Sequence, residues 1–381
     1  MLNEETGAPW PGRRGLLLAG ASALLLSAAG CASDGGSGSG TGSGGGGGGS
    51  GTGTGSASAT NPPEPSPSPT PTATAAATST APSTATSTAP STAPSTATAT
   101  VAVAALPKPP PWQPSASDVQ PDVKRRAVEL VTAIGSWPVG GGGPEAARAR
   151  VAALGLPPTL VDQAGPLAPA AEEAALEVIE AQYGGILADT SSVMVACRQW
   201  TRQADGSIAE GGTTVDVRLS REQPRWAVTE LIPGVPAAPT ASPSPAVGQV
   251  LAQPRIQLPP AAVADLRSGV VHESVLRAML DLAGTYRLSL TVLRSGHPLD
   301  VFGTSRPSDH PRGRALDVWQ IDGQAVVDAA TPRRLIESFM RDAAAAGSYN
   351  VGGPIALSGG AGNQFFTDET HHDHVHIGFT T

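Results

Sequence analysis

The sequence predicts an α+β protein in which a long low-complexity stretch precedes two folded segments. Residues 31–117 are almost entirely Gly, Ser, Thr, Ala and Pro, and a second Pro-rich stretch covers 233–251. Such tracts have too little apolar surface to offset the entropy of ordering, so we expect disordered linkers at both places. The remaining segments, 118–232 and 252–381, show helical and strand-like apolar periods, and each predicts a small α+β domain.

The chain begins with a pattern that is typical of a secretory signal peptide, which we assign to residues 1–30. Arg13 and Arg14 precede an apolar run of about a dozen residues, too short to span a bilayer. The run closes with Ala28-Ala29-Gly30 before Cys31, which resembles the lipobox of bacterial lipoproteins. The resemblance implies a lipid on Cys31 and an anchor to the outer face of the cell membrane, as in actinobacterial-type lipoproteins. Ordinary secretion with an incidental cysteine is the alternative, and Sec and twin-arginine export both stay open.

The charge and cysteine content argue against a nucleic-acid-binding protein and against an intramolecular disulfide. The net charge is −8, the lysines are Lys108 and Lys124, and no basic run favours nucleic-acid binding. With Cys31 lipidated, Cys197 has no cysteine to pair with, and we expect it to be a buried strand residue. A tether of about 85 residues has a reach on the order of 50 Å, which would place the folded segments within the cell wall.

The segment 118–232 carries three helical patterns followed by strand-like runs. Helices are expected at 121–134, 145–154 and 170–183, and strands in "SVMVACRQWTR", "GTTVDVRLSR" and "RWAVTELIP". This order loosely resembles the cone-shaped domains of the nuclear-transport-factor-2-like superfamily. We interpret Trp200 and Trp226 as core or sheet-face residues, and we expect the domain to have a positioning or binding role.

The segment 252–381 predicts a helix at 259–282, a strand near 286–293, a helix at 332–346 and a last strand at 374–379. Between the first strand and the second helix, "RALDVWQI" alternates and predicts a strand that carries Asp317. Together these elements predict a central antiparallel sheet with a metal site on one face.

The histidines indicate that metal site. All seven lie between His272 and His376, and four of them fall in "HHDHVH". His310 lies on the loop before the strand of Asp317, with Gly313 allowing a tight approach and Ala315 leaving room. On a terminal strand, His374 and His376 project from the same face. His310, Asp317 and His376 then form a ligand set of two imidazoles and one carboxylate, which leaves a fourth position for water, as in catalytic zinc sites.

The ordered spacing of these residues resembles that of a known enzyme group. The run Ser308–Asp317, "SDHPRGRALD", fits the S-x-H-x-x-G-x-A-x-D motif of zinc D-Ala-D-Ala carboxypeptidases, dipeptidases and L-Ala-D-Glu endopeptidases. The "HVH" is similar to the H-x-H of the wider lysostaphin, D-Ala-D-Ala-metallopeptidase and hedgehog group. The resemblance implies that domain's fold, Zn²⁺ on His310, Asp317 and His376, substrate binding by Ser308, and peptidoglycan stem peptides as substrates. Taken alone, Ser308 is equally explained as a turn cap.

The resemblance also suggests which residues transfer protons during peptide hydrolysis. Peptidases of this group carry Glu or Asp three residues before the last histidine, which makes Asp373 the favoured base and His374 a transition-state stabiliser. Lysostaphin-like members use the first histidine of H-x-H instead, which would make His374 the base. Arg294 ends a strand-like run and is the candidate for stabilising the carbonyl oxyanion.

The remaining histidines receive no ligand role. His371 and His372 are expected on a loop, His272 on a helix surface, and His297 beside the cleft. Whether the enzyme would be a carboxypeptidase or an endopeptidase stays open. The alternative to an enzyme is a zinc-binding or cell-wall-binding lipoprotein module with the same fold.

Overall fold

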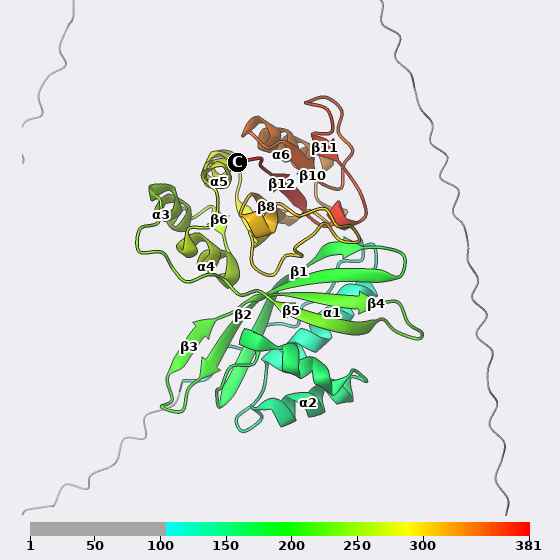
Figure 1. The fold of residues 1–381 in the computed structure, drawn as a ribbon, viewed down its shortest axis with the longest axis vertical. Coiled ribbons are helices and arrows are strands. Elements are labelled where there is room, and N and C mark those ends of the chain that lie inside the picture. The colour runs from blue at the N-terminus through cyan, green and yellow to red at the C-terminus, as the bar shows by residue number, and fades with distance from the viewer. Residues whose placement is uncertain (1–103) are drawn as a thin grey trace, which may run out of the picture. The chain divides into compact units, whose positions relative to one another are not determined.

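The computed structural model describes residues 104–381, so the expected signal peptide, Cys31 and the tether up to residue 103 lie outside the described residues. The α+β class is confirmed, and the described chain forms two lobes (Figure 1). The expected disorder is corrected for residues 104–117, which lie against the first lobe: Leu106 is buried, and Arg202 donates a hydrogen bond to the carbonyl of Ala104.

The first lobe (104–233) consists of two α-helices and one antiparallel sheet. The sheet order is β1-β2-β4-β5, with β3 paired to the outer part of β2. Its elements are α1 (Pro121–Gly135), α2 (Pro144–Ala153), 3₁₀ turns at Pro158–Gln163 and Gly165–Leu167, β1 (Glu173–Ile186), β2 (Thr190–Arg202), β3 (Ile208–Gly211), β4 (Thr214–Ser220) and β5 (Ala227–Pro233).

The helix expected at 170–183 is wrong, because this stretch forms β1. Its Ala- and Glu-rich sequence favours a helix by local propensity, but tertiary pairing overrides that preference. β1 pairs with β2 from Glu173 to Ile186, with two bulges that leave it strongly curved. β1 is an edge strand of the sheet, and its C-terminal half faces the second lobe.

The second lobe (245–381) consists of four helices on one face of a mixed sheet ordered β11-β10-β12-β8-β7-β6, with β9 beside β8. The expected all-antiparallel sheet is corrected here, because β6 pairs with β7 and β10 with β11 in parallel. The elements are α3 (Pro245–Ala252), β6 (Ile256–Gln257), α4 (Pro260–Ser268), α5 (Glu273–Thr285), β7 (Leu288–Val292), a 3₁₀ turn at His310–Arg312, β8 (Ala315–Ile321), β9 (Gln324–Ala325), α6 (Arg333–Ala345), β10 (Asn350–Gly352), β11 (Phe365–Phe366), a turn at Thr370–His372 and β12 (Val375–Gly378).

Two departures from the expected elements have local causes. The helix expected at 259–282 is split into α4 and α5, because Gly269 takes a left-handed conformation with φ of +73° and ends α4. The stretch 233–251, expected as a linker, contains α3. Its Ala246, Val247 and Val250 are buried in the core of the second lobe, so this helix has an apolar face that the Pro-rich composition conceals.

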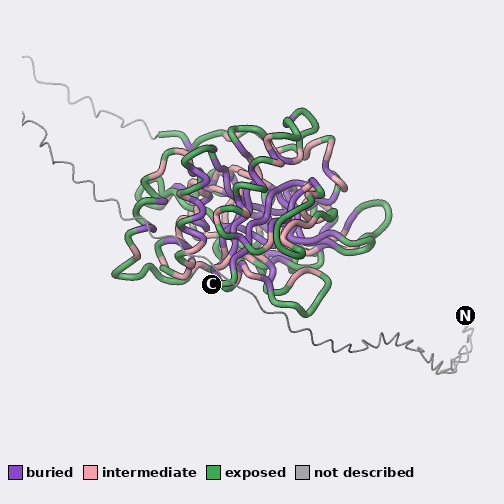
Figure 2. The backbone as a smooth tube through the Cα atoms, turned by 90° about the horizontal axis from the view of Figure 1, so that it is seen from above, coloured by how far each residue is buried: buried purple, intermediate pink, exposed green. Residues whose placement is uncertain are grey.

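Each lobe has its own hydrophobic core. In the first, α1 packs Val123, Leu130 and Ile134 against the sheet, and the expected burial of Cys197 is confirmed. In the second, the helices cover the sheet face that carries Leu316, Val318, Val375 and Ile377. Figure 2 shows the buried residues gathered inside and the exposed ones along the peripheral loops. None of the helices between residues 104 and 381 has the length and apolar character needed to cross a bilayer.

The uncovered face of the second sheet lies against the first lobe. Along a strand, side chains alternate between faces, so burial of Leu316 and Val318 in the core directs Asp317 to the opposite face. The same alternation in β12 directs His376 there. Over the described residues both lobes belong to one compact unit, and β1 lies beside this face (Figure 1).

Candidate metal centre

Three predicted ligand atoms converge on one point. Asp317 and His376 are direct cross-strand partners on β8 and β12, and Asp317 Oδ1 lies 3.0 Å from His376 Nδ1. His310 Nε2 lies 3.0 Å from Asp317 Oδ1 and 3.1 Å from His376 Nδ1. Two ligands of a tetrahedral zinc ion are separated by about 3.3 Å, since each bond is about 2.0–2.1 Å. The triangle therefore fits a single metal ion.

The proton arrangement also favours a cation. His310 Nδ1 donates to the carbonyl of Leu293 at 2.8 Å, which leaves Nε2 of the neutral ring as a bare acceptor. That acceptor faces the carboxylate oxygen of Asp317. Two acceptors 3.0 Å apart repel each other unless a cation or a proton lies between them. His310 and Asp317 are buried, so the local chemistry suits a metal ion.

The titration behaviour of the ligands agrees. Burial would raise the pKa of Asp317, but His310 and His374 around it hold the pKa well below its usual value. Burial lowers the pKa of His376 to about 4, and the attraction of Asp317 offsets only part of this effect. The carboxylate is ionised and the His376 imidazole neutral near pH 7, which are the forms that bind metal.

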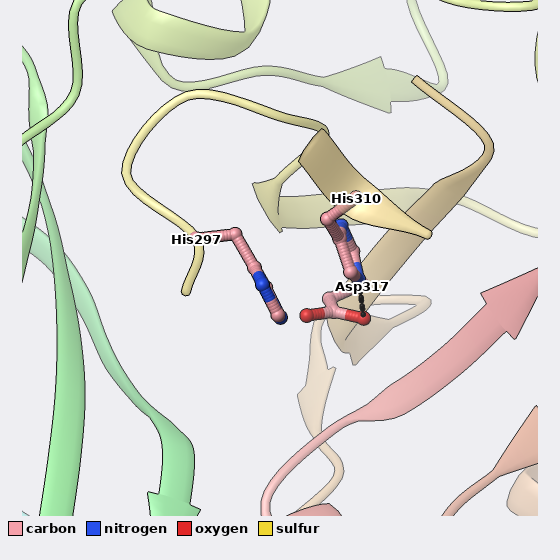
Figure 3. A group of neighbouring side chains, drawn as sticks. All are labelled: His297, His310 and Asp317. Carbon is pink, nitrogen blue, oxygen red and sulfur yellow. Dashed lines mark hydrogen bonds and ion pairs between the residues drawn. The ribbon is translucent and has the colours of Figure 1, made fainter. Parts of the chain in front are cut away.

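His297 lies next to the triangle, where the sequence gave it no ligand role. One nitrogen of its ring, one of His310 and one oxygen of Asp317 lie within 4.8 Å of one another, a second set that could hold a metal ion (Figure 3). Its ring stacks on that of His310, with centroids 4.0 Å apart and planes inclined by 12°. Nitrogen lone pairs lie in the ring plane, so two stacked parallel rings do not converge on one ion as His310 and His376 do. The 3.0–3.1 Å triangle is therefore the better ligand set.

A cavity of about 460 Å³ opens beside the triangle. Ser308 lines it, and its hydroxyl accepts a hydrogen bond from the His310 backbone at 3.3 Å, as a turn cap does. Gly313, with φ of +71°, closes the turn before β8; a Cβ there would lie 2.1 Å from the carbonyl of Val270. Gly313 therefore allows a tight approach, but to the backbone of Val270 and Val271 rather than, as the sequence had suggested, to the strand of Asp317.

The wall of this cavity comes from both lobes. Tyr183, Gly184, Ile186 and Leu187 contribute the first-lobe side. The second lobe contributes Phe302, Arg306, Ser308, Asp309, Asn350, Phe366, Asp368, Thr370 and the histidines 297, 310, 371, 374 and 376. A cavity of this volume is in the range of small-molecule and short-peptide sites, and the candidate metal ligands His310, Asp317 and His376 are among its lining residues.

Asp373 lies behind this wall rather than in it. Its Oδ1 accepts from His374 Nδ1 at 2.6 Å, and its Oδ2 accepts from Lys124 Nζ at 2.7 Å and from the Tyr183 N–H at 2.9 Å. Burial would raise its pKa, but Lys124 and His374 hold it at about 2. Every oxygen of Asp373 is engaged, whereas His374 has its Nδ1 fixed and lines the cavity.

The other two histidines of "HHDHVH" have different surroundings. His371 lines the cavity, and Asp368 fixes its Nδ1 at 2.7 Å. Phe366 packs edge-on against the His371 ring, with centroids 4.7 Å apart. His372 points away, toward the first lobe, where its Nε2 lies 2.9 Å from the carbonyl of Ser117. The cluster therefore divides into one ligand candidate, two cavity residues and one inter-lobe contact.

Arg294 is placed elsewhere. Its Nε donates to the carbonyl of Pro311 at 3.1 Å, and the residue lines a neighbouring cavity of about 460 Å³ behind the loop that carries His297. The oxyanion role expected for Arg294 has no support from this position. His371, in contrast, lines the cavity beside the triangle.

Two first-lobe side chains reach this centre, and neither was predicted from the sequence. Gln182 Nε2 donates to Asp317 Oδ2 at 2.7 Å, and Lys124 binds Asp373 as described above. Gln182 and Lys124 lie far from the motif in the sequence, so no short-range spacing of residues could have pointed to them. The one available signal was Lys124 itself, one of two lysines in the chain, among the mostly apolar buried residues of α1.

None of the protein-family models, curated proteins or solved structures compared with this chain matches it.

Proposed function

We propose that this protein is a zinc-dependent peptidase that hydrolyses peptidoglycan stem peptides at the cell envelope. The observation that carries the proposal is the triangle of His310, Asp317 and His376 at the base of a cavity that can hold a peptide. Two imidazoles and one carboxylate, with one side open, are the donor set of catalytic zinc sites. The spacing of Ser308–Asp317 and "HVH" resembles the D-Ala-D-Ala-metallopeptidase group and supports the same reaction class.

The zinc ion would supply Lewis-acid chemistry, polarising a carbonyl and making water acidic enough to act as a nucleophile near pH 7. The chain's own residues then have to handle protons and charge. His374 faces the cavity with Nε2 free of the contact to Asp373, so His374 is the acceptor for the water proton and the donor to the leaving amine. Asp373 fixes the ring orientation and tautomer of His374.

The pKa of His374 agrees with this role. Burial lowers it, but the carboxylates of Asp317 and Asp373 outweigh burial and raise it above the ordinary value of 6.5. A base with a pKa near the working pH exchanges protons effectively. His371 would stabilise negative charge on the carbonyl oxygen, and Ser308 would contact the bound peptide.

The alternative function is a non-catalytic zinc-binding module. The proximity of His297 is the observation that favours it, because a fourth protein ligand would close the site as in structural zinc centres. The stacked geometry of His297 and His310 opposes this reading. A cavity that opens on the ligands also favours an enzyme.

The envelope location rests on the sequence outside the described residues. A lipid on Cys31 and a tether of about 85 residues would hold both lobes within reach of the cell wall. Stem peptides are then the peptide substrates present at that distance from the membrane.

Digestion of purified peptidoglycan by a soluble form of the chain, residues 32–381, which omits the signal peptide and Cys31, tests the proposal. We expect new peptide ends in the mass spectrum, loss of cleavage with a chelator, and recovery with Zn²⁺. The masses also decide between carboxypeptidase and endopeptidase. If zinc-loaded protein leaves every stem peptide intact, the peptidase proposal fails and the non-catalytic zinc-binding module becomes the proposed function.

A further inference from the structure

The first lobe touches the metal centre through buried polar groups. Gln182 on β1 is fully buried and donates to Asp317 Oδ2, the carboxylate oxygen that does not belong to the ligand triangle. Lys124 on α1 is fully buried and binds Asp373, the residue that fixes His374. Two different second-lobe residues at the site are therefore held by two different elements of the first lobe.

We propose that the first lobe completes the metal centre, with Gln182 positioning the ligand Asp317 and Lys124 positioning the Asp373–His374 pair. The Gln182 part requires only that the triangle binds metal. The Lys124 part also rests on the proposed hydrolysis.

The Gln182 hydrogen bond goes to the one oxygen of Asp317 that lies outside the ligand triangle, which close packing alone would not require. A carboxylate that binds a metal through one oxygen needs its other oxygen fixed, and hydrogen-bond donors in the surrounding shell do this in metalloproteins. Among the described residues, the Oε1 atom of Gln182 is buried without a hydrogen-bond partner. A buried amide that leaves its carbonyl unpaired is costly, and the hydrogen bond from the same amide to Asp317 is the contact that offsets this cost.

The Lys124 contact is part of a closed network. Lys124 Nζ lies 2.5 Å from Asp118 Oδ1 and 2.7 Å from Asp373 Oδ2, and all three side chains are at most 1% exposed. The ammonium also lies 4.7 Å from the centre of the Tyr183 ring. The Tyr183 backbone donates to the same Asp373 oxygen, so α1 and β1 together fix the carboxylate.

The two contacts lead to different measurable effects. Loss of the Gln182 donor frees Asp317 to rotate and should weaken metal binding by roughly 10- to 100-fold, the usual effect of removing such a partner. Loss of the Lys124 ammonium frees Asp373 and His374, which do not belong to the ligand triangle, so it should lower kcat without changing zinc affinity.

The metal arm uses the mature full chain and measures Zn²⁺ affinity by competition with a chelating dye. Gln182→Met keeps the length of the side chain but cannot donate. Gln199→Met is the matched control, because Gln199 is also buried in the first lobe but donates to Gly135 and Leu167 within that lobe. We expect weaker zinc binding for Gln182→Met and wild-type affinity for Gln199→Met. Should Gln182→Met not fold, Gln182→Asn, which keeps the amide but shortens it, should show the same weakening.

The catalytic arm compares Lys124→Met, Lys124→Arg and the control Lys108→Met, whose side chain is exposed. We expect Lys124→Met to lower kcat with zinc affinity and KM unchanged, Lys124→Arg to recover part of the rate, and Lys108→Met to behave as wild type. If Lys124→Met does not fold, the kcat of Lys124→Arg tests the catalytic part of the inference, and the zinc affinity of Gln182→Met tests the metal part.

The outcomes separate the inference from the proposed function. Wild-type zinc affinity in Gln182→Met, or equal loss in Gln199→Met, overturns the inference even if the protein hydrolyses peptides. Weaker binding in Gln182→Met alone supports it even if no peptide is cleaved, and then only the peptidase assignment fails. A Lys124→Met protein with an unchanged kcat overturns the catalytic part.

Discussion

Asp317 on β8 and His376 on β12 are cross-strand partners, and their Oδ1 and Nδ1 atoms lie 3.0 Å apart. Antiparallel register places such a pair side by side whatever its function, but the third atom, His310 Nε2, comes from a turn outside the sheet. Three acceptors meeting at one point is the relationship on which the functional account depends.

Removing a ligand should empty the site. We expect about one zinc ion per wild-type chain and little zinc in His310→Ala or His376→Ala, because two remaining ligands bind zinc weakly. Metal analysis after gel filtration measures this directly. Full zinc content in either variant would show that the ligands lie elsewhere.

His297→Ala should keep its zinc. The ring of His297 stacks parallel to that of His310 and is not required to complete the triangle. The same metal analysis applies, with His310→Ala as the matched comparison, since both variants remove an imidazole from the same cluster. Loss of zinc in His297→Ala would make the site a closed four-ligand centre and favour the non-catalytic module.

His374→Ala should cost more activity than Asp373→Asn. A positioned general base is worth about 10²- to 10⁴-fold in rate, whereas loss of the residue that orients it costs about 10- to 100-fold. Both variants should retain zinc, and kcat on a stem peptide is the measurement. The opposite ranking would return the base role to Asp373, as the sequence pattern first suggested.

Glu180 should make stability fall as pH rises. Burial on β1 raises its pKa from 4.5 to about 7, with Lys124 opposing and Asp373 and Asp118 adding to the shift. The folded state then favours the protonated carboxyl, so this contribution is complete below pH 4.5 and is lost as pH rises through 7. Because the side chain is partly exposed, we expect an effect on the order of 1–2 kcal/mol.

Chemical denaturation between pH 4 and pH 8 measures this effect. Glu180→Gln should flatten the profile and exceed the wild type in stability at pH 8. Glu177→Gln, on the same strand, controls for removing a carboxylate. A Glu180→Gln profile parallel to that of the wild type would contradict the assignment.

Cys31→Ser should release the protein from the membrane fraction or block its processing, since a lipid on Cys31 is the expected anchor. Fractionation followed by mass spectrometry of the N-terminal peptide tests this. A wild-type protein that is found free of lipid in the medium would show ordinary secretion instead.

The sequence predicted the site better than it predicted the first lobe. Period-2 alternation around Asp317 and His376 is a direct consequence of strand geometry, and α1, α2, α6, β7, β8 and β12 lie close to their expected positions. β1 was missed because its Ala- and Glu-rich sequence has local helix propensity, and its pairing with β2 is a tertiary effect. The linker assignment at 233–251 missed α3 for a similar reason, since only the core reveals its apolar face.

The contacts between the two lobes could not be predicted from local sequence patterns. Gln182 lies 135 residues from Asp317, and nothing in its immediate sequence distinguishes it from a surface glutamine. The pairing of Lys124 with Asp373 depends on how the two lobes meet. Asp373 therefore looked like a free carboxylate near the motif, although its oxygens are engaged by Lys124, Tyr183 and His374.

The most direct test of the central claim is a crystal structure of the zinc-loaded protein, with anomalous diffraction measured on both sides of the zinc edge. We expect one strong peak about 2.0–2.2 Å from His310 Nε2, Asp317 Oδ1 and His376 Nδ1, with the open side of the metal toward the cavity. A peak coordinated by His297 in place of His376, or a protein that takes up zinc only at surface sites, would contradict it.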